Sequence, residues 1–414
     1  MAPLSATDDD VEVVRPLQGE PHSCEVAVVK RLKAADQQTD SQCPSFLPRR
    51  FDVFKRWPTS LNLPPFRETV MDFLEVDGSY GEGGGQILRT SLWFSIVQNK
   101  PVHITKIRAG RVDPGLKRQH VSSLEVLARV FDCELTGAVE GSRDVRFVPG
   151  HARQETLSLS MGTAASITLV LQAVIPAVAL SKSRLSIELG GGTDVPWSLT
   201  FDYLSSMVRE VYATIGVNFE AKALRRGYYP KGGGLARVTI EECTSLRPLR
   251  LVQLPHLREA NIVSRCSVLP RHVAERQAKA ASSLLNTEGV GVGETEITEE
   301  AADSPGSSIL VSAKGSGFFL GADAIGAKGR PAEAVGEDAA RGIIGSIRSG
   351  ACMDINLADM VAPLLSLAEG PSELRVPRVS QHLETGLHLA RLFTGCEYST
   401  KADEASFIVS IMPK

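Results

Sequence analysis

Three glycine triplets are the first indication of chemistry in this sequence, at residues 83–85, 190–192 and 232–234. Glycine lets backbone N–H groups approach a phosphate closely, and the start of a helix adds a favourable partial charge. A single triplet is more often a tight turn, and none of the three fits the P-loop or dinucleotide-binding patterns. The first triplet is the strongest candidate because Glu82 and Arg89 flank it. A carboxylate, a cation and bare amides together suit a metal-bound triphosphate.

Basic residues concentrate in the stretch from His103 to Arg129. Within it, Arg108 and Arg111 bracket a loop that is broken by glycine and proline residues. On such a loop, two rigid guanidinium forks can reach a terminal phosphate, each with two hydrogen bonds. We therefore favour phosphate binding for these two arginines, whereas Lys117 and Arg129 fit the exposed, charged face of a helix better.

A third candidate is His382, which follows an expected strand at residues 373–376 and begins the last expected helix. A neutral imidazole is a competent nucleophile toward an activated phosphorus at pH 7, since its ordinary pKa is about 6.5. A position at the start of a helix favours this neutral form over the cation. Taken alone, such a histidine is more often a capping or core residue. His388 has the spacing of an ordinary helix-face residue.

The composition describes a globular protein of a reducing compartment, which predicts a cytoplasmic location, or a nuclear one in a eukaryote. The chain has 414 residues, 43% of them hydrophobic and 22% charged, and no apolar run of the length that spans a membrane. Its seven cysteines show no CxxC pair, which argues against a zinc site and a disulfide framework. A net charge of −3 excludes an extended basic surface that follows a nucleic-acid backbone. It does not exclude binding of one terminus by a few local cations.

The elements that must position these residues recur in one order along the chain. Residues 1–70 lack sustained periodicity and predict a disordered extension or a start codon assigned too early. Residues 71–249 and 348–414 predict a domain of three βα repeats. Residues 250–347 break that plan and predict a small inserted α/β domain. The alternation of strands and helices throughout indicates an α/β or α+β fold.

Six long motifs resemble the RNA 3'-terminal phosphate cyclase family, in its catalytic branch. They are Asp77–Arg89, Ile107–Arg111, Pro114–His120, Gly190–Trp197, Arg226–Gly234 and Pro270–Arg276. The resemblance covers the chain from about Met71 to its end in consistent order. It implies a large domain of three βα repeats related to the enolpyruvyl transferases, with a small inserted α/β domain.

The resemblance also implies a three-step ligase reaction on an RNA 3'-phosphate end. A histidine attacks the α-phosphorus of ATP and releases pyrophosphate, and the AMP then moves to the RNA 3'-phosphate. The neighbouring 2'-hydroxyl displaces AMP and closes a 2',3'-cyclic phosphate. By position the nucleophile falls on His382, and Glu82 would hold Mg²⁺ or Mn²⁺. The nucleotide contacts fall on Gln172, Asn356, Leu357, Ala358, Asp359 and Met360, and the phosphate and RNA-end contacts on Arg89, Arg108, Arg111 and Gln119.

Two positions depart from the family pattern, and one alternative function stays open. Met360 stands where the family usually has glutamine, and methionine cannot donate the amide hydrogen bonds. Asn356 stands where cyclases commonly have an aromatic residue or histidine. The alternative is a non-catalytic, cyclase-like factor of ribosome biogenesis, which lacks the nucleophilic histidine. A small-molecule transferase of the related fold would need no adenylate. The sequence leaves the physiological RNA and the oligomeric state open.

Overall fold

The structure, a computed structural model, describes residues 72–162 and 164–414. The extension predicted for residues 1–70 lies outside the described residues. All described residues belong to one compact unit of the chain. None of the helices in the described part combines the length and the apolar character that a membrane span requires.

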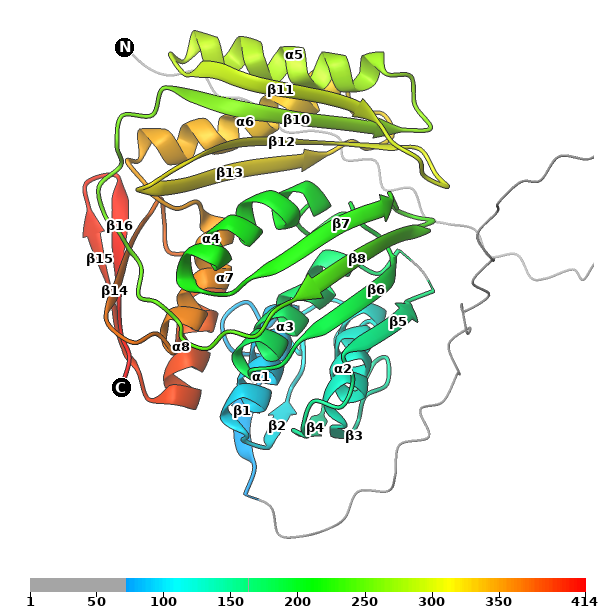
Figure 1. The fold of residues 1–414 in the computed structure, drawn as a ribbon, viewed down its shortest axis with the longest axis vertical. Coiled ribbons are helices and arrows are strands. Elements are labelled where there is room, and N and C mark those ends of the chain that lie inside the picture. The colour runs from blue at the N-terminus through cyan, green and yellow to red at the C-terminus, as the bar shows by residue number, and fades with distance from the viewer. Residues whose placement is uncertain (1–71, 163) are drawn as a thin grey trace, which may run out of the picture. The chain divides into compact units, whose positions relative to one another are not determined.

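The first repeat forms a four-stranded mixed sheet with two helices (Figure 1). Its elements are β1 (Leu74–Asp77), α1 (Gly85–Gln98), β2 (Val102–Thr105), α2 (Arg118–Phe131), β3 (Glu134–Thr136) and β4 (Val145–Val148). The strands lie in the order β1-β2-β4-β3, with β1 and β2 parallel and the other pairs antiparallel. The carboxyl ends of β1 and β2 therefore open toward the glycine loop and the basic loop.

The second repeat has the same topology. Its elements are β5 (Thr156–Ser160), α3 (Ile167–Leu180), β6 (Leu185–Gly191), a π-helical stretch η1 (Tyr203–Val208) that continues into α4 (Arg209–Ile215), β7 (Phe219–Arg225) and β8 (Gly234–Ile240). The strand order is β5-β6-β8-β7, with β5 and β6 parallel. The second repeat thus places its own pair of loops at the carboxyl ends of two parallel strands.

The third repeat begins with a strand that is far from the rest of it in the sequence. The short β9 (Arg250–Leu251) pairs in parallel with β14 (Ser372–Val376), more than a hundred residues later. The other elements are α7 (Ile355–Leu365), α8 (Gln381–Thr394), β15 (Glu397–Asp403) and β16 (Ser406–Met412). The strand order β9-β14-β16-β15 matches that of the other two repeats.

A fourth sheet interrupts the third repeat and has a different topology. Its elements are β10 (Glu259–Ser267), α5 (His272–Thr287), β11 (Gly291–Glu299), β12 (Gly306–Gly315), β13 (Phe318–Ile325) and α6 (Ala332–Arg348). The strand order is β11-β10-β12-β13, and a separate hydrophobic cluster lies under its two helices. The expectation of a mixed α/β fold built from repeated βα units is therefore confirmed, while the enolpyruvyl transferase relationship and the domain boundaries stay predictions.

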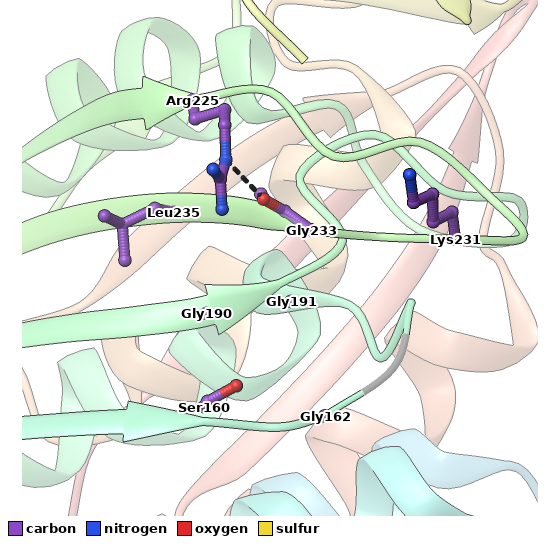
Figure 2. Close-up of a pocket in the computed structure, with 9 residues that line it drawn as sticks. Ser160, Gly162, Gly190, Gly191, Arg225, Lys231, Gly233 and Leu235 are labelled. Atoms are coloured by element: carbon purple, nitrogen blue, oxygen red, sulfur yellow. Dashed lines mark hydrogen bonds between the residues drawn. The ribbon is translucent and has the colours of Figure 1, made fainter. Parts of the chain in front are cut away.

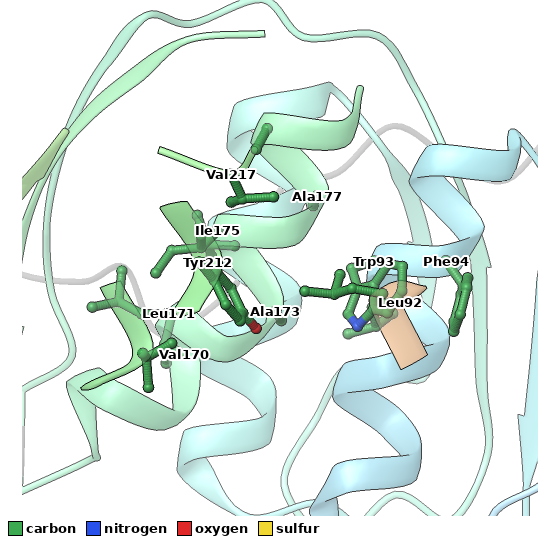
Figure 3. Packing of buried hydrophobic residues seen from close by; sticks show 14 of the residues in the cluster. Leu92, Trp93, Phe94, Val170, Leu171, Ala173, Ile175, Ala177, Tyr212 and Val217 are labelled. Carbon is green, nitrogen blue, oxygen red and sulfur yellow. The ribbon is translucent and has the colours of Figure 1, made fainter. Parts of the chain in front are cut away.

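One hydrophobic core joins the three repeats through their helices. Helix α1 packs against α3 and α8, α2 packs against α3, and α7 packs against α8. Figure 3 shows Leu92 and Trp93 of α1 in the same cluster as Val170 of α3 and Tyr212 of α4. The buried cluster includes residues from all three repeats, so their relative positions are fixed by the removal of apolar surface from water.

Buried ion pairs join the inserted sheet to the second repeat. Arg226, whose side chain is 3% exposed, lies 3.1 Å from Asp194, 2.9 Å from Asp202 and 2.5 Å from Glu300. Arg265 of β10 adds a contact of 2.9 Å to Asp202. A buried guanidinium needs such partners because an unpaired buried charge is costly. The contacts hold β10 and the end of β11 against the segments that follow β6 and β7.

Candidate active site

The loop between β1 and α1 folds tightly around the carboxylate of Glu82. Gly81 and Gly83 have φ angles of +63° and +58°, which glycine adopts more readily than other residues. A Cβ atom on Gly84 would lie 2.0 Å from Glu82 Oε1, and one on Gly85 would lie 2.3 Å from His120 Nε2. Side chains at these positions would therefore displace the polar groups of the site, which explains the glycine triplet.

Glu82 links His382 to the basic loop after β2. Its Oε1 atom lies 3.2 Å from His382 Nδ1, and its Oε2 atom lies 3.1 Å from Arg111 Nη2. The His382 contact lacks hydrogen-bond geometry. The carboxylate stands between an imidazole from α8 and a cation from the loop after β2, so the first and third repeats together form the site.

His382 is held by the start of helix α8. Ser380 Oγ caps this helix by accepting a hydrogen bond of 2.9 Å from the Leu383 amide, and the same hydroxyl donates to Asp359. Gln86 Nε2 donates to the backbone oxygen of His382 at 3.1 Å. Helices α1, α7 and α8 are thus joined by hydrogen bonds at the backbone next to His382.

Two arginines of the site have a hydrogen-bond donor that no protein group accepts from in the part of the chain that the structure describes. The Nε atoms of Arg89 and Arg108 are buried and make no hydrogen bond with any described residue. Burial lowers the pKa of Arg89 to about 10, although the Glu82 carboxylate opposes this shift. A guanidinium with an unused buried donor is suited to an oxyanion that enters from outside.

His120 behaves as a neutral part of the framework. It is 1% exposed, and its Nδ1 atom accepts a hydrogen bond of 2.9 Å from the Lys117 amide at the start of α2. Burial, together with the charges of Arg89, Arg108 and Lys117, lowers its pKa to about 3. His120 therefore supports the glycine loop without carrying a charge.

A cavity of about 270 Å³ lies next to His382. It is lined by Gln86, Arg89, Leu169, Gln172, Trp197, Ser198, Leu199, Asp323, Asn356, Asp359, Met360 and His382. These residues come from helices α1, α3, α7 and α8, from the segment after β6 and from strand β13. The cavity combines apolar walls with a few polar groups, as binding sites for small molecules generally do.

The structure brings together most of the residues that the sequence suggested. Arg89, Gln172, Asn356, Asp359, Met360 and His382 line the cavity, and Glu82 and Arg111 adjoin it through His382. Leu357 and Ala358 instead face the core, with exposures of 0% and 1%. Gln119, on the first turn of α2, does not line the cavity.

Sequence reasoning missed Gln86, Trp197 and Asp323. Gln86 directly follows the first glycine triplet, so its place in the sequence could have indicated that it belongs to the site. Trp197 is 95% exposed and has a φ of +62°, an unusual combination for a large side chain. Asp323 comes from β13 and accepts a hydrogen bond of 2.6 Å from the Thr200 amide, a pairing that the sequence does not reveal.

The site favours a neutral imidazole at His382. Burial lowers the pKa of His382, the nearby Arg89 and Arg111 lower it further, and only Glu82 opposes them. Burial also raises the pKa of Asp359 to about 7, so this carboxyl is partly protonated near neutral pH. A neutral ring keeps a lone pair available at one nitrogen.

We expect the His382 imidazole to titrate below pH 6.5 and to respond in opposite directions to two substitutions. Glu82→Gln removes the charge that stabilises the imidazolium and should lower the pKa further. Arg111→Gln removes a repelling cation and should raise it. NMR titration of labelled histidines measures both shifts, with the His382 signal assigned from its loss in His382→Gln. Shifts of the same sign would contradict this electrostatic account.

Comparison with known proteins identifies the relatives of this chain. A family model described as RNA 3'-terminal phosphate cyclase matches residues 80–400. The chain belongs to the RNA 3'-terminal phosphate cyclase family. It is 40% identical over 328 residues to the RNA 3'-terminal phosphate cyclase of Pyrococcus furiosus, covering 79% of this chain and 94% of that protein. The resemblance of the six motifs to this family is thereby confirmed.

Two further members of the RNA 3'-terminal phosphate cyclase family show the same extent of similarity. The Methanopyrus kandleri cyclase is 40% identical over 330 residues, with 78% of this chain and 94% of that protein covered. The Caldivirga maquilingensis cyclase is 38% identical over 346 residues, with 82% and 98% covered. The similarity therefore spans nearly the whole length of these family members.

Proposed function

We propose that this chain is an RNA 3'-terminal phosphate cyclase that uses ATP and carries AMP covalently on His382. Family membership supports the overall activity. The observation that carries the proposed nucleophile is the position of His382 on the cavity, 3.2 Å from Glu82 and beside a buried arginine with unused donors. The alternative, a non-catalytic factor of the same fold, is disfavoured by this histidine.

In the first step, His382 would attack the α-phosphorus of ATP. Glu82 favours a proton on Nδ1, which leaves the lone pair of Nε2 as the nucleophile. The Nε2–phosphorus bond forms as the bond to the bridging oxygen breaks, and pyrophosphate leaves. Glu82 then stabilises the positive charge that develops on the ring, while Arg89 stabilises the charge on the phosphoryl oxygens.

In the next two steps, the nucleotide passes to RNA and is displaced. An oxygen of the RNA 3'-phosphate attacks the α-phosphorus, and His382 leaves as a neutral ring. The 2'-oxygen then attacks the terminal phosphorus, AMP departs and the 2'-hydroxyl proton is released. Arg108 and Arg111, on the loop after β2, would hold the terminal phosphate for both steps.

A divalent metal fits the site only if phosphate oxygens of the substrate complete its coordination shell. The described residues contain no group of three or more histidine, cysteine, aspartate or glutamate side chains able to hold a metal ion. Glu82 supplies one hard oxygen ligand, and Mg²⁺ or Mn²⁺ is often bound by one carboxylate together with substrate phosphates. When bound there, the metal would neutralise charge on the triphosphate.

The nucleobase would occupy the part of the cavity that is lined by α3, α7 and the segment after β6. Gln172 offers an amide there, and Leu169, Leu199 and Met360 offer apolar contacts. Asn356 cannot stack on a base, whereas the exposed Trp197 at the same cavity can. We therefore assign base stacking to Trp197, and packing against the base, in place of amide hydrogen bonds, to Met360.

Trp197→Ala should raise the KM for ATP about tenfold, since stacking of a base on an aromatic ring contributes about 1–3 kcal/mol. Trp197→Phe should keep most of the affinity. Steady-state kinetics of cyclisation at varied ATP, with a saturating 3'-phosphorylated oligonucleotide, measures the effect. Tyr229→Ala is the matched control, because Tyr229 is also an exposed aromatic residue, at 63%, but does not line the cavity. An equal KM rise in both variants would contradict the assignment.

The direct test of the function uses ATP labelled at the α-phosphate. Incubation of the protein with this ATP should give an acid-labile protein–AMP adduct. Addition of a 3'-phosphorylated oligoribonucleotide should discharge the adduct and yield a 2',3'-cyclic phosphate end. An adduct that RNA does not discharge would argue for a different acceptor, and no adduct at all would favour the non-catalytic alternative.

A further inference from the structure

The second and third glycine triplets meet at a cavity that the proposed reaction does not use. This cavity has a volume of about 300 Å³ and lies on the sheet of the second repeat (Figure 2). It is lined by Ser160, Gly162, Gly190, Gly191, Arg225, Lys231, Gly233, Gly234 and Leu235. None of these residues lines the cavity beside His382. The two cavities are therefore distinct.

The hollow arises because two neighbouring residues in one row across the sheet, Ser160 and Gly190, are small. Ser160 pairs with Gly190, Gly190 pairs with Leu235, and Leu235 pairs with Arg225, so the four residues share one face. Their neighbours in the strands, such as Leu189, are buried on the opposite face. Even a Cβ on Gly190 would lie 3.3 Å from Ser160 Oγ, so a longer side chain would fill the space.

Two cations border this hollow and are held by backbone oxygens. Arg225 Nε donates to the Gly233 oxygen at 2.7 Å (Figure 2). Lys231 Nζ donates to the Asp303 backbone oxygen at 3.0 Å. One carboxylate opposes them, since Asp303 Oδ2 lies 3.6 Å from Arg225 Nη2. Two fixed cations against one carboxylate leave the hollow net positive. The chemistry favours an anion with several oxygens.

The position in the repeat also indicates phosphate binding. Ser160 and Gly190 lie at the carboxyl ends of the parallel strands β5 and β6. In the first repeat, the loops at the corresponding ends of β1 and β2 carry Glu82, Arg108 and Arg111. Ligands of sheets with parallel strands generally bind outside such carboxyl ends. The second repeat thus has a counterpart of the loops to which we assign the terminal phosphate.

We propose that this hollow is a second phosphate-binding site, which takes an internal phosphodiester of the RNA strand upstream of its 3' end. The inference rests on the proposed function. Gly191 in the hollow and Trp197 at the His382 cavity are about six residues apart, a span of at most about 22 Å. A stacked strand with one phosphate per roughly 3.4 Å covers a distance of this order with about six nucleotides, so an oligonucleotide whose 3' end lies at the His382 cavity can reach the hollow.

Strand length provides the decisive test. The double variant Arg225→Gln/Lys231→Gln should raise the KM for a 3'-phosphorylated 12-mer about tenfold and leave that for a trinucleotide unchanged. The dependence of the 12-mer KM on salt concentration should also weaken, since phosphate contacts release counterions. Arg237→Gln is the matched control, because Arg237 lies on the same face but pairs with Glu188 at 2.6 Å. It should change neither KM.

A second variant tests the same site by raising its affinity for RNA, with both cations kept in place. Asp303→Asn removes the opposing carboxylate and should lower the KM for the 12-mer several-fold. Free pyrophosphate carries the same phosphate oxygens and is the other anion that could bind in the hollow. If pyrophosphate inhibits the parent but not the double variant, and strand length has no effect, the hollow binds the free anion. Unchanged KM values and unchanged inhibition by pyrophosphate in all of these variants would contradict the proposed phosphate site.

Self-adenylylation separates this inference from the proposed function. The double variant and Asp303→Asn should both form the protein–AMP adduct at the parental rate, because neither changes a residue of the His382 cavity. A double variant that labels normally but shows no change with any oligonucleotide would reject the phosphate site alone. Absence of the adduct in the parent would reject the proposed function itself.

Discussion

His382→Ala should abolish the covalent AMP adduct and reduce cyclisation by at least about a thousandfold, which is the scale of loss when a covalent nucleophile is removed. An alanine side chain has no lone pair to form a bond with the α-phosphorus, and water in its place would release free AMP instead of an enzyme adduct. Labelling with ATP carrying a radioactive α-phosphate, followed by denaturing electrophoresis, measures the adduct directly.

The matched control for this variant lies on the same helix. His388 is also a partly buried histidine of α8 whose pKa is lowered by burial, but its ring stacks on Tyr80 at 3.9 Å. His388→Ala should label at the parental level. His382 has a side-chain exposure of 42%, so its removal should leave the melting temperature close to that of the parent. An alanine variant at 382 that labels normally would assign the nucleophile elsewhere.

The local chemistry of the site could be predicted from the sequence because short-range spacing carries it. Glu82 and Arg89 flank one glycine triplet, and Arg108 and Arg111 share one loop, so their proximity follows from local structure. The repetition of strand and helix likewise predicts the mixed α/β fold. Periodicity and turn residues determine such features within a few tens of residues.

Contacts across the chain could not be predicted in this way. Glu82 and His382 are about three hundred residues apart, and Gln86 binds a backbone oxygen of α8, so only the packing of the repeats brings them together. The pairing of β9 with β14 across the inserted sheet has no local signal for the same reason. Helical periodicity alone also cannot say that Leu357 faces the core while Asn356 faces the cavity.

Arg89→Met should reduce adenylate transfer at least about a hundredfold while leaving the protein as stable as the parent or more stable. The guanidinium is buried, and burial lowers its pKa from 12.5 to about 10. A shift of this size corresponds to roughly 3 kcal/mol by which the fold disfavours the charged form. Since the unfolded chain binds the proton more tightly, this penalty is fully present at pH 7 and is relieved only as the pH rises past about 10.

Methionine fills a similar space without a charge, so the substitution removes the penalty and creates no large cavity. Replacement of a buried charged group by an apolar one of similar size is often neutral or stabilising. Thermal melting should therefore give a Tm at or above that of the parent, whereas labelling with ATP should fall at least a hundredfold because one oxyanion-stabilising group is lost. A lower Tm with normal labelling would show that Arg89 serves the fold and not the reaction.

A lysine at the same position separates charge from hydrogen-bond geometry. Arg89→Lys keeps the cation but loses the planar fork, so it should retain more activity than the methionine variant and less than the parent. ATP should raise the Tm of the parent, because a ligand that binds only the folded state stabilises it, and this rise should vanish in Arg89→Met. A buried arginine whose Nε has no protein partner is thus costly in the free protein, and the phosphate supplies the partner that makes its burial favourable.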